Sequence, residues 1–245
     1  MSIVTQLKTK LFADGADKKG MLDMYQHPYI KGFTTNPTLM RKAGITDYQA
    51  FALDILQAIP DRSISFEVFV DDLDEMVEQA NLIAAWGENV MVKIPVTNTQ
   101  GEFTGRIIKQ LSAAGIPLNI TAILTLEQVR AIAACLSEKT AAIVSVFAGR
   151  IADTGVDPIP LMQDALKILQ PLPKAELLWA SPRELLNVVQ ANEIGCHIIT
   201  ATNDILNKLH LLGKDLADYS LDTVKMFYKD AQAAGYQIMP LEEAV

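Results

Sequence analysis

The feature that most constrains the fold is a regular alternation of short apolar runs with longer segments of helical periodicity. The short runs are rich in β-branched residues, which is typical of buried strands. Eight strands, each followed by a helix or a helical turn, predict an α/β fold whose parallel sheet closes into a (β/α)8 TIM barrel. A doubly wound open sheet is the alternative, because alternation alone does not distinguish an open sheet from a closed one.

The boundaries of the expected elements follow from this pattern. The expected strands are Lys10–Asp14, Gly32–Thr35, Ser63–Val68, Val90–Pro95, Leu118–Ala122, Ala142–Phe147, Leu177–Ala180 and His197–Thr200. The helical patterns between them include Asp71–Ala85, Arg106–Ala114, Leu126–Leu136, Pro160–Leu169 and Arg183–Ala191.

The length of the chain fits one such domain. A TIM barrel takes about 250 residues, and the 245 residues here contain no Gly/Ser linker, low-complexity segment or short repeat. We therefore expect a single domain over residues 1–245. Near its end, Asp222–Ala234 has the apolar residues Val224, Phe227 and Ala231 at helical spacing. We expect a helix there that packs on the barrel or on a neighbouring subunit.

The charge balance restricts the partners. A net charge of −8 argues against a broad basic surface, so we expect no binding to nucleic acid, whereas a small cationic pocket for an anionic metabolite remains compatible. No apolar run approaches the roughly 20 residues that a membrane span needs. The first residues also lack the apolar stretch of a signal peptide. We therefore expect a cytoplasmic protein without membrane association.

Residues that hold metals or form disulfides are sparse. Cys135 and Cys196 lie far apart without a CxxC motif, and we expect two reduced, buried thiols. The three histidines, His27, His197 and His210, lack ligand spacing, and the apolar run around His197 favours a core position. The GxGxxG and P-loop motifs of nucleotide sites are missing. The sequence thus predicts neither a metal nor a cofactor.

Polar residues lie near the carboxyl end of almost every predicted strand. The active sites of α/β barrels are built at these ends, whereas a barrel that only needs to be stable requires no polar groups there. In chain order these residues are Asp14, Asn36, Glu67, Lys93, Asn119, Thr121, Ser145, Ser181 and Arg183.

Lys93 is the most specific of these signals, because every neighbour in the segment VMVKIPV is apolar. A lysine in such a strand is buried unless the strand end opens into a cavity, and burial disfavours the ammonium form. A neutral amine is the nucleophile that Schiff-base enzymes direct at carbonyl substrates. The alternative is a lysine whose head group reaches solvent or pairs with a carboxylate.

Two carboxylates are expected at the same rim. Glu67 lies in the preceding strand, so matching registers would place it about 5 Å from Lys93. Either a structural ion pair or a general acid/base role fits a half-buried carboxylate in that place. Asp14 ends the first strand, where a lone aspartate is often a turn or cap residue. Two carboxylates and a lysine on three strands favour catalysis.

Amide and hydroxyl groups have two interpretations. Asn36, within Thr-Thr-Asn-Pro, is either a turn residue or an amide aimed at a substrate hydroxyl. Asn119 and Thr121 invite the same pair of interpretations. None of the three decides the function alone.

Arginines follow the sixth and seventh strands, where barrel enzymes often bind phosphate. Arg150, Ser181 and Arg183 offer two guanidinium groups and a hydroxyl for charge-assisted hydrogen bonds. The alternative is a pair of solvated surface arginines, and Asp153 offers Arg150 a local salt bridge.

Together, these residues resemble the transaldolase family, including its short branch that contains the fructose-6-phosphate aldolases. The combination of the TTNP, VKIP and GRI segments is specific, and the matches follow the family's order along nearly the whole barrel. The resemblance implies a metal-free class I aldol mechanism in a (β/α)8 barrel. The matching segments are Phe12–Asp14, Thr34–Pro37, Glu67, Val92–Pro95, Asn119–Thr121, Ser145–Arg150 and Ala180–Arg183.

The resemblance also implies a role for each residue. Lys93 is expected to form the Schiff base, and Asp14 to take the C4 hydroxyl proton during C3–C4 cleavage. Glu67 and Thr121 are expected to hold a water for proton transfer at the carbinolamine. The remaining implied contacts are those to the dihydroxyacetone hydroxyls, from Asn36, Asn119 and Ser145, and those to the phosphate, from Arg150, Ser181 and Arg183.

Two positions separate transaldolases from the aldolase branch. Transaldolases carry Glu in place of Gln, as at Glu67, and Phe in place of Tyr three residues before the clamp arginine, as at Phe147. Two departures from the family pattern accompany these matches. Pro182 replaces the more typical Phe, which leaves a sulfonated ketose open as the donor. The segment FADG lacks the usual hydroxyl residue that supports the aspartate, here Asp14.

The leading hypothesis is therefore a transaldolase of the pentose phosphate pathway that forms homo-oligomers. It would move a dihydroxyacetone unit from sedoheptulose 7-phosphate or fructose 6-phosphate to erythrose 4-phosphate or glyceraldehyde 3-phosphate. A lyase that releases free dihydroxyacetone is the second hypothesis. A catalytically silent barrel that binds sugar phosphates is the third, and the set of Asp14, Glu67 and Lys93 argues against it.

Overall fold

The computed structural model describes residues 3–238. These residues fall into two compact units, residues 3–209 and residues 210–238, and each is described by itself. The organisation of the whole chain as one domain stays a prediction. Within the described residues, no helix combines the length and the apolar character needed to cross a membrane.

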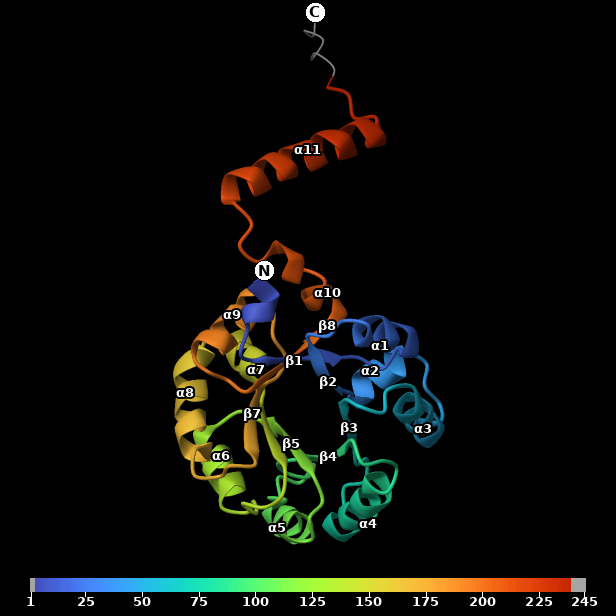
Figure 1. Cartoon of the computed structure of the whole chain (residues 1–245), viewed down its shortest axis with the longest axis vertical. Helices are drawn as coiled ribbons and strands as arrows, with labels where there is room; N and C mark the ends of the chain where they lie inside the picture. The colour runs from blue at the N-terminus through green and yellow to red at the C-terminus, as the bar shows by residue number, and fades with distance from the viewer. Residues whose placement is uncertain (1–2, 239–245) are drawn as a thin grey trace, which may run out of the picture. The chain divides into compact units, whose positions relative to one another are not determined.

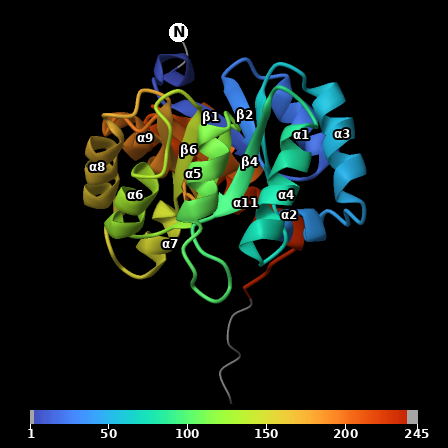
Figure 2. The ribbon, with the colours of Figure 1, turned by 90° about the horizontal axis from the view of Figure 1, so that it is seen from below.

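Eight parallel strands form a closed barrel in the first unit, paired in chain order with the last strand against the first. The expected (β/α)8 barrel is thus confirmed, and the open-sheet alternative is wrong. Figures 1 and 2 show the strands at the centre of this unit with the helices around them. The strands are β1 (Lys10–Asp14), β2 (Ile30–Thr34), β3 (Ser63–Glu67), β4 (Val90–Pro95), β5 (Leu118–Ile123), β6 (Ala142–Val146), β7 (Ala175–Trp179) and β8 (Ile198–Thr202).

The helices of this unit mostly begin at an Asp, Asn or Thr whose side chain accepts a backbone N–H of the first turn, as Asp72 and Asp157 do. The α-helices are α1 (Lys18–Tyr25), α2 (Pro37–Lys42), α3 (Tyr48–Ala58), α4 (Leu73–Ala84), α5 (Gly105–Ala113), α6 (Leu126–Ala133), α7 (Ala148–Asp153), α8 (Pro158–Leu169), α9 (Leu186–Glu193) and α10 (Asn203–Leu206). Two 3-10 helices are η1 (Ile3–Gln6) and η2 (Leu209–Leu211).

The expected core position of His197 is wrong. The strand β8 begins one residue later, and His197 is exposed, with its Nδ1 accepting the backbone N–H of Leu177 at 2.9 Å. The residues that follow, Ile198 and Ile199, are both buried, whereas His197 precedes the strand and lies outside the core. The expectation of two buried thiols is only half right, since Cys196 is buried and Cys135 is partly exposed; both are free.

The interior of the barrel is a packed core beneath the strand ends. Phe12, Met91, Ile143, Leu178 and Ile198 form one buried cluster. They come from β1, β4, β6, β7 and β8, and β4 borders none of the other four, so all five side chains meet only inside the barrel. Leu178 of this cluster also lines the cavity at the carboxyl ends of the strands.

Gly32 on β2 makes room for this core. A Cβ at Gly32 would lie 2.5 Å from the ring of Phe12, which is its partner in the register of β1 and β2. Only glycine fits where the ring crosses the neighbouring strand so closely.

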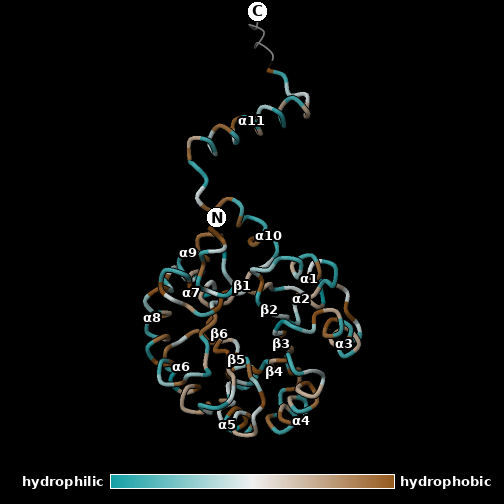
Figure 3. The backbone as a smooth tube through the Cα atoms, in the orientation of Figure 1, coloured by the Kyte–Doolittle hydropathy of each residue, from teal (hydrophilic) through white to brown (hydrophobic). Residues whose placement is uncertain are grey.

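The second unit is dominated by one helix, α11 (Leu216–Ala234). Asp215 caps its first turn, and Gly235 ends it in the left-handed conformation with φ of 67°. It begins six residues before the expected segment, and none of its residues is buried. Hydrophobic and hydrophilic residues alternate along it in Figure 3, and Val224 and Phe227 are 61% and 63% exposed.

Candidate active site

A pocket of about 600 Å³ lies at the carboxyl ends of the strands. All of the candidate residues from the sequence line it: Asp14, Asn36, Glu67, Lys93, Asn119, Thr121, Ser145, Phe147, Arg150, Ser181 and Arg183. The barrel explains this gathering, because parallel strands end on the same side and deliver their last residues to one cavity.

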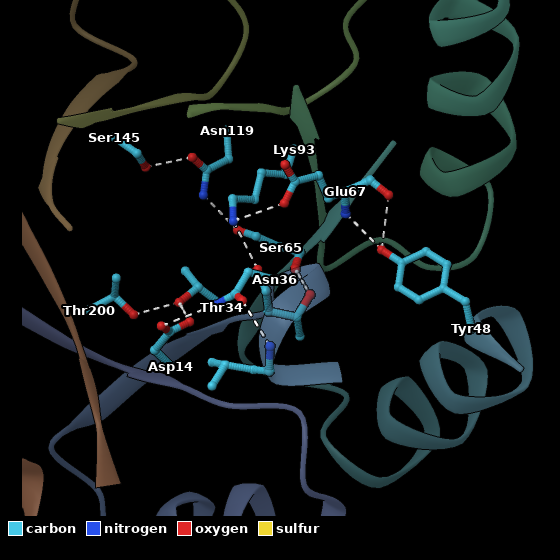
Figure 4. A network of polar contacts seen from close by, with 12 residues as sticks. Asp14, Thr34, Asn36, Tyr48, Ser65, Glu67, Lys93, Asn119, Ser145 and Thr200 are labelled. Carbon is cyan, nitrogen blue, oxygen red and sulfur yellow. Dashed lines mark hydrogen bonds and ion pairs between the residues drawn. The ribbon is translucent and has the colours of Figure 1, made fainter. Parts of the chain in front are cut away.

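Lys93 lies on the wall of this pocket and is only 7% exposed. Its Nζ donates to the carbonyl oxygen of Thr35 at 2.9 Å and lies 3.2 Å from Oε2 of Glu67 (Figure 4). The register of β3 and β4 pairs Glu67 directly with Lys93, as the sequence suggested. Lys93 is therefore a buried amine with one carboxylate within proton-transfer distance.

Tyr48, at the start of α3, holds the end of the strand that carries Glu67. Its hydroxyl accepts the backbone N–H of Glu67 at 2.7 Å and donates to the Glu67 carbonyl at 3.1 Å. The ring packs edge-on against Phe66, Phe69 and Trp86. Burial raises the pKa of Tyr48, so the hydroxyl keeps its hydrogen. The Tyr48 hydroxyl thus satisfies the backbone hydrogen-bonding groups of Glu67 and holds its backbone in place.

Asp14 stands across the pocket on β1. Its Oδ1 accepts the Thr34 hydroxyl at 2.7 Å, and Nδ2 of Asn36 lies 3.5 Å from Oδ2. The support missing from FADG thus comes from the next strand. Burial raises the pKa of Asp14, while the charge of Lys93 and the hydrogen bonds from Thr34 and Asn36 lower it. The net effect is that the ionised form of the Asp14 carboxyl is less stable here than it is in water.

Asn36 serves both as a helix cap and as a pocket residue. Its Oδ1 accepts the backbone N–H of Leu39 at 3.0 Å, and Pro37 occupies the first turn of α2. With the oxygen held by the helix, Nδ2 faces Asp14. The turn interpretation of Asn36 is confirmed by the helix cap, whereas its contact with a substrate hydroxyl stays a prediction.

A chain of hydrogen bonds links β6, β5 and β3 below Lys93. Ser145 donates to Oδ1 of Asn119 at 2.6 Å, and Nδ2 of Asn119 donates to the hydroxyl of Ser65 at 2.9 Å. This chain orients the Asn119 amide. The Thr121 hydroxyl, by contrast, is buried without a hydrogen-bond partner among the described residues, so it remains available to a bound molecule.

The arginines lie at the open side of the pocket. Arg150 is exposed, and its guanidinium lies 5.4 Å from the centre of the Phe147 ring. Arg183 Nε donates to Oδ1 of Asp153 at 2.8 Å, and Nη2 makes a second contact to the same carboxylate. The local pair of Arg150 with Asp153 that the sequence offered is thus replaced by a pair with Arg183, which lowers the pKa of Asp153.

The backbone of this arginine side is tightly packed. A Cβ at Gly149 would lie 1.5 Å from the carbonyl oxygen of Ser181, so α7 approaches the turn after β7 more closely than a side chain permits. Ser181 itself has φ of 57°, a conformation that residues other than glycine seldom adopt. Pro182 next to it is buried.

Comparison with known proteins identifies the family of this barrel. The family model described as Transaldolase/Fructose-6-phosphate aldolase matches residues 11–238. The chain belongs to this family.

Relatives that align over most of their own length bear the name probable transaldolase. A probable transaldolase of Dehalococcoides mccartyi is 32% identical over 91% of this chain and 99% of its own length. Another from Nitrosopumilus maritimus is 34% identical over 82% of this chain and 86% of its own. A third, from Thermoanaerobacter, is 31% identical over 94% of this chain and 100% of its own.

Solved structures support the fold at greater distance. Dihydrodipicolinate synthase of Rhodopseudomonas palustris superposes with a TM-score of 0.57 at 14% identity, covering 91% of this chain and 79% of its own. A putative lyase/mutase of Burkholderia cenocepacia reaches 0.58 at 11% identity, covering 98% and 91%. At such identities the similarity concerns the barrel alone.

Several polar residues in or beside this pocket were not among the candidates predicted from the sequence. Thr200 lines the pocket and contacts Thr34, Ser65 contacts Asn119, and Tyr48 holds the strand of Glu67. Thr200 ends the last predicted strand, which is a detectable signal. In the sequence, Tyr48 is far from the end of any predicted strand, and no sequence pattern connects it to Glu67.

Proposed function

We propose that this protein is a transaldolase that carries a dihydroxyacetone unit on Lys93. The donor is sedoheptulose 7-phosphate or fructose 6-phosphate, and the acceptor is erythrose 4-phosphate or glyceraldehyde 3-phosphate. The observation that carries the proposal is the buried amine of Lys93, 3.2 Å from the Glu67 carboxylate in the pocket that also holds Asp14. Binding alone needs no buried amine, which argues against a silent barrel.

Formation of the Schiff base begins with a proton transfer. Glu67 accepts the proton from the Lys93 ammonium group, and the free amine attacks the C2 carbonyl of the ketose. The carbinolamine then loses water, and Glu67 and Thr121 hold the water that shuttles protons. The Thr121 hydroxyl has no other hydrogen-bond partner in the described part of the chain. The product of this stage is an iminium ion on Lys93.

Cleavage follows at the opposite wall of the pocket. Asp14 takes the proton from the C4 hydroxyl, the C3–C4 bond breaks, and its electron pair moves to the iminium carbon and nitrogen as an enamine. The aldose product leaves, and the enamine attacks the aldehyde of the acceptor while Asp14 returns the proton. Asn36, Asn119 and Ser145 orient the hydroxyls of the three-carbon unit in this proposal.

The anionic end of the sugar is assigned to Arg150, Ser181 and Arg183. Arg183 is exposed and uses one edge of its guanidinium for Asp153, so its remaining N–H groups point elsewhere. A phosphate between the two arginines would gain charge-assisted hydrogen bonds. Because Pro182 shapes this turn, a sulfonated ketose belongs in the same donor panel.

Glu67 and Phe147 favour transfer over release of free dihydroxyacetone. The matching experiment supplies fructose 6-phosphate with and without erythrose 4-phosphate. A transaldolase produces sedoheptulose 7-phosphate, and more than one equivalent of glyceraldehyde 3-phosphate per enzyme, only when the acceptor is present. Rapid release of dihydroxyacetone without acceptor would instead establish a lyase. Lys93→Met should abolish turnover and leave binding of the sugar phosphate largely intact.

We also propose a homo-oligomer in the cytoplasm, within the pentose phosphate pathway. The exposed apolar residues of α11 support association, since a helix of this kind gains most of its stability by packing an apolar face. Free cysteines are usual in the reducing cytosol.

A further inference from the structure

The hydroxyl of Thr200 on β8 contacts the hydroxyl of Thr34, which is the hydrogen-bond partner of Asp14. The strand β1 pairs with β8 through Phe12 and Thr200, and with β2 through Asp14 and Thr34. The buried hydroxyl of Thr34 lies 2.7 Å from Oδ1 of Asp14 and 2.6 Å from the buried hydroxyl of Thr200 (Figure 4). Three neighbouring strands thus form a chain of two hydroxyls that ends on a carboxylate.

The number of hydrogens fixes the direction of this chain. An ionised carboxylate only accepts hydrogen bonds, and each threonine hydroxyl has one hydrogen to give. Thr34 gives its hydrogen to Asp14, so the hydrogen between the two threonines belongs to Thr200. The chain therefore runs from Thr200 to Thr34 to Asp14.

The same count indicates which oxygen of Asp14 binds a proton. With a proton on Oδ1, the Thr34 oxygen would accept from Asp14, and the hydrogen of either Thr34 or Thr200 would lack an acceptor among the described hydrogen bonds. A proton on Oδ2 leaves both bonds intact. The contact to Oδ2 from Asn36 is long, at 3.5 Å, so this hydrogen bond is weaker than the one from Thr34 to Oδ1.

We propose that Thr200 is a positioning residue, which turns the Thr34 hydroxyl toward Oδ1 and so confines the exchangeable proton of Asp14 to Oδ2. The inference rests on the proposed function, in which Asp14 exchanges a proton with the C4 hydroxyl of the substrate. On cleavage, that proton moves from the hydroxyl oxygen to Oδ2, and on addition to the acceptor it moves back.

Asp14 titrates among several charged groups, none of which is altered when Thr200 changes. Lys93 and Glu67 line the pocket of the candidate site together with Asp14. Asp14 also lines a second, smaller pocket, whose charged residues are Asp17, Lys42 and Asp204. A donor to a carboxylate stabilises the ionised form, and a hydroxyl that is itself hydrogen-bonded donates more strongly. Loss of the Thr200 hydroxyl should therefore raise the pKa of Asp14 further.

The test compares Thr200→Val with Thr200→Ser. Infrared titration of the substrate-free protein follows the Asp14 carboxyl band, which Asp14→Asn identifies by its loss. We expect Thr200→Val to raise the pKa of Asp14 by roughly half a unit. Because cleavage needs ionised Asp14, the acid limb of the kcat/KM profile should move up equally, and Thr200→Ser should restore both.

The matched control is Thr9→Val, which removes a buried hydroxyl bonded to the Cys196 carbonyl, before the amino end of β1. It should reduce stability without shifting the Asp14 titration. If Thr200→Val does not fold, Thr200→Ala provides the same comparison.

An Asp14 band that titrates as in the wild type in folded Thr200→Val or Thr200→Ala would overturn the proposal, as would an equal shift in Thr9→Val. The infrared readout needs no turnover. A wild-type protein without aldol activity therefore refutes the proposed function alone, and the titration shift still supports the hydroxyl chain.

Discussion

The surroundings of Asp14 oppose the ionised form of its carboxyl group. Its carboxyl is held between Thr34, Asn36 and the positive charge of Lys93, yet burial outweighs these contacts and raises its pKa. An aspartate in this state accepts a proton readily at the pH where an exposed one would not. The same environment makes the ionised group unfavourable in the folded protein.

Asp14→Asn should therefore stabilise the protein at neutral pH. The folded-state pKa is raised, so the cost of the carboxylate is fully present above that pKa and disappears as the pH falls through it toward the ordinary value of about 3.9. We expect a melting temperature a few degrees higher than the wild type at pH 8 and a smaller difference at pH 5. Scanning calorimetry measures both.

The control is Asp164→Asn, which removes an exposed carboxylate paired with Lys167. It should change stability little at either pH. A loss of stability in Asp14→Asn at pH 8 would contradict the assigned cost of burial.

The close contact of α7 with the turn after β7 governs the arginine side of the pocket at the scale of elements. Gly149 lies against the Ser181 carbonyl, and Ser181 holds a left-handed backbone there. Arg150 directly follows Gly149, and Arg183 lies two residues after Ser181. Backbone packing therefore places both arginines. The motif Gly-Arg-Ile has a steric reason for its glycine.

Gly149→Ala should separate these two elements. The added Cβ meets backbone, which cannot move aside as a flexible side chain would, so we expect a loss of about 2–3 kcal/mol in the free energy of unfolding. The KM for the phosphorylated donor should rise as Arg183 moves. Denaturant unfolding and steady-state kinetics check the two effects. Gly15→Ala, where nothing lies within 4 Å of the new Cβ, should leave stability nearly unchanged.

The elements show what the sequence could reveal about the fold and the site. Apolar runs located all eight strands to within a few residues, because burial on both faces leaves a strong local signal. The pairing of Glu67 with Lys93 was also foreseeable, since neighbouring strands carry them. The contacts of Tyr48, at the start of α3, and of Asp153, at the end of α7, depend on how elements distant in the sequence pack, and no local pattern encodes that. His197 was misplaced because the apolar run does not show that the strand begins one residue later, at Ile198.

The helix α11 raises a question at the scale of the whole molecule. A helix of 19 residues with no buried residue exposes Tyr219, Val224 and Phe227 to water. Isolated amphipathic helices are only marginally stable, so such a face usually packs against protein. Association of subunits would bury it, which is the basis of the proposed homo-oligomer.

Val224→Asp together with Phe227→Asp should weaken that association. Two charges on the apolar face are costly to bury, and sedimentation velocity should show a shift to smaller species at micromolar concentration. The control, Lys225→Ala with Lys229→Ala, changes net charge equally on the opposite face and should keep the wild-type size. A wild-type protein that is already monomeric would refute the oligomer.

The most direct test of the account is covalent trapping on Lys93. The protein is incubated with fructose 6-phosphate, reduced with borohydride and digested, and the peptides are analysed by mass spectrometry. We expect a stable three-carbon or six-carbon adduct on Lys93 in the wild type and none in Lys93→Met. An unmodified Lys93 with every phosphorylated and sulfonated ketose tried, or an adduct on another lysine, would contradict it.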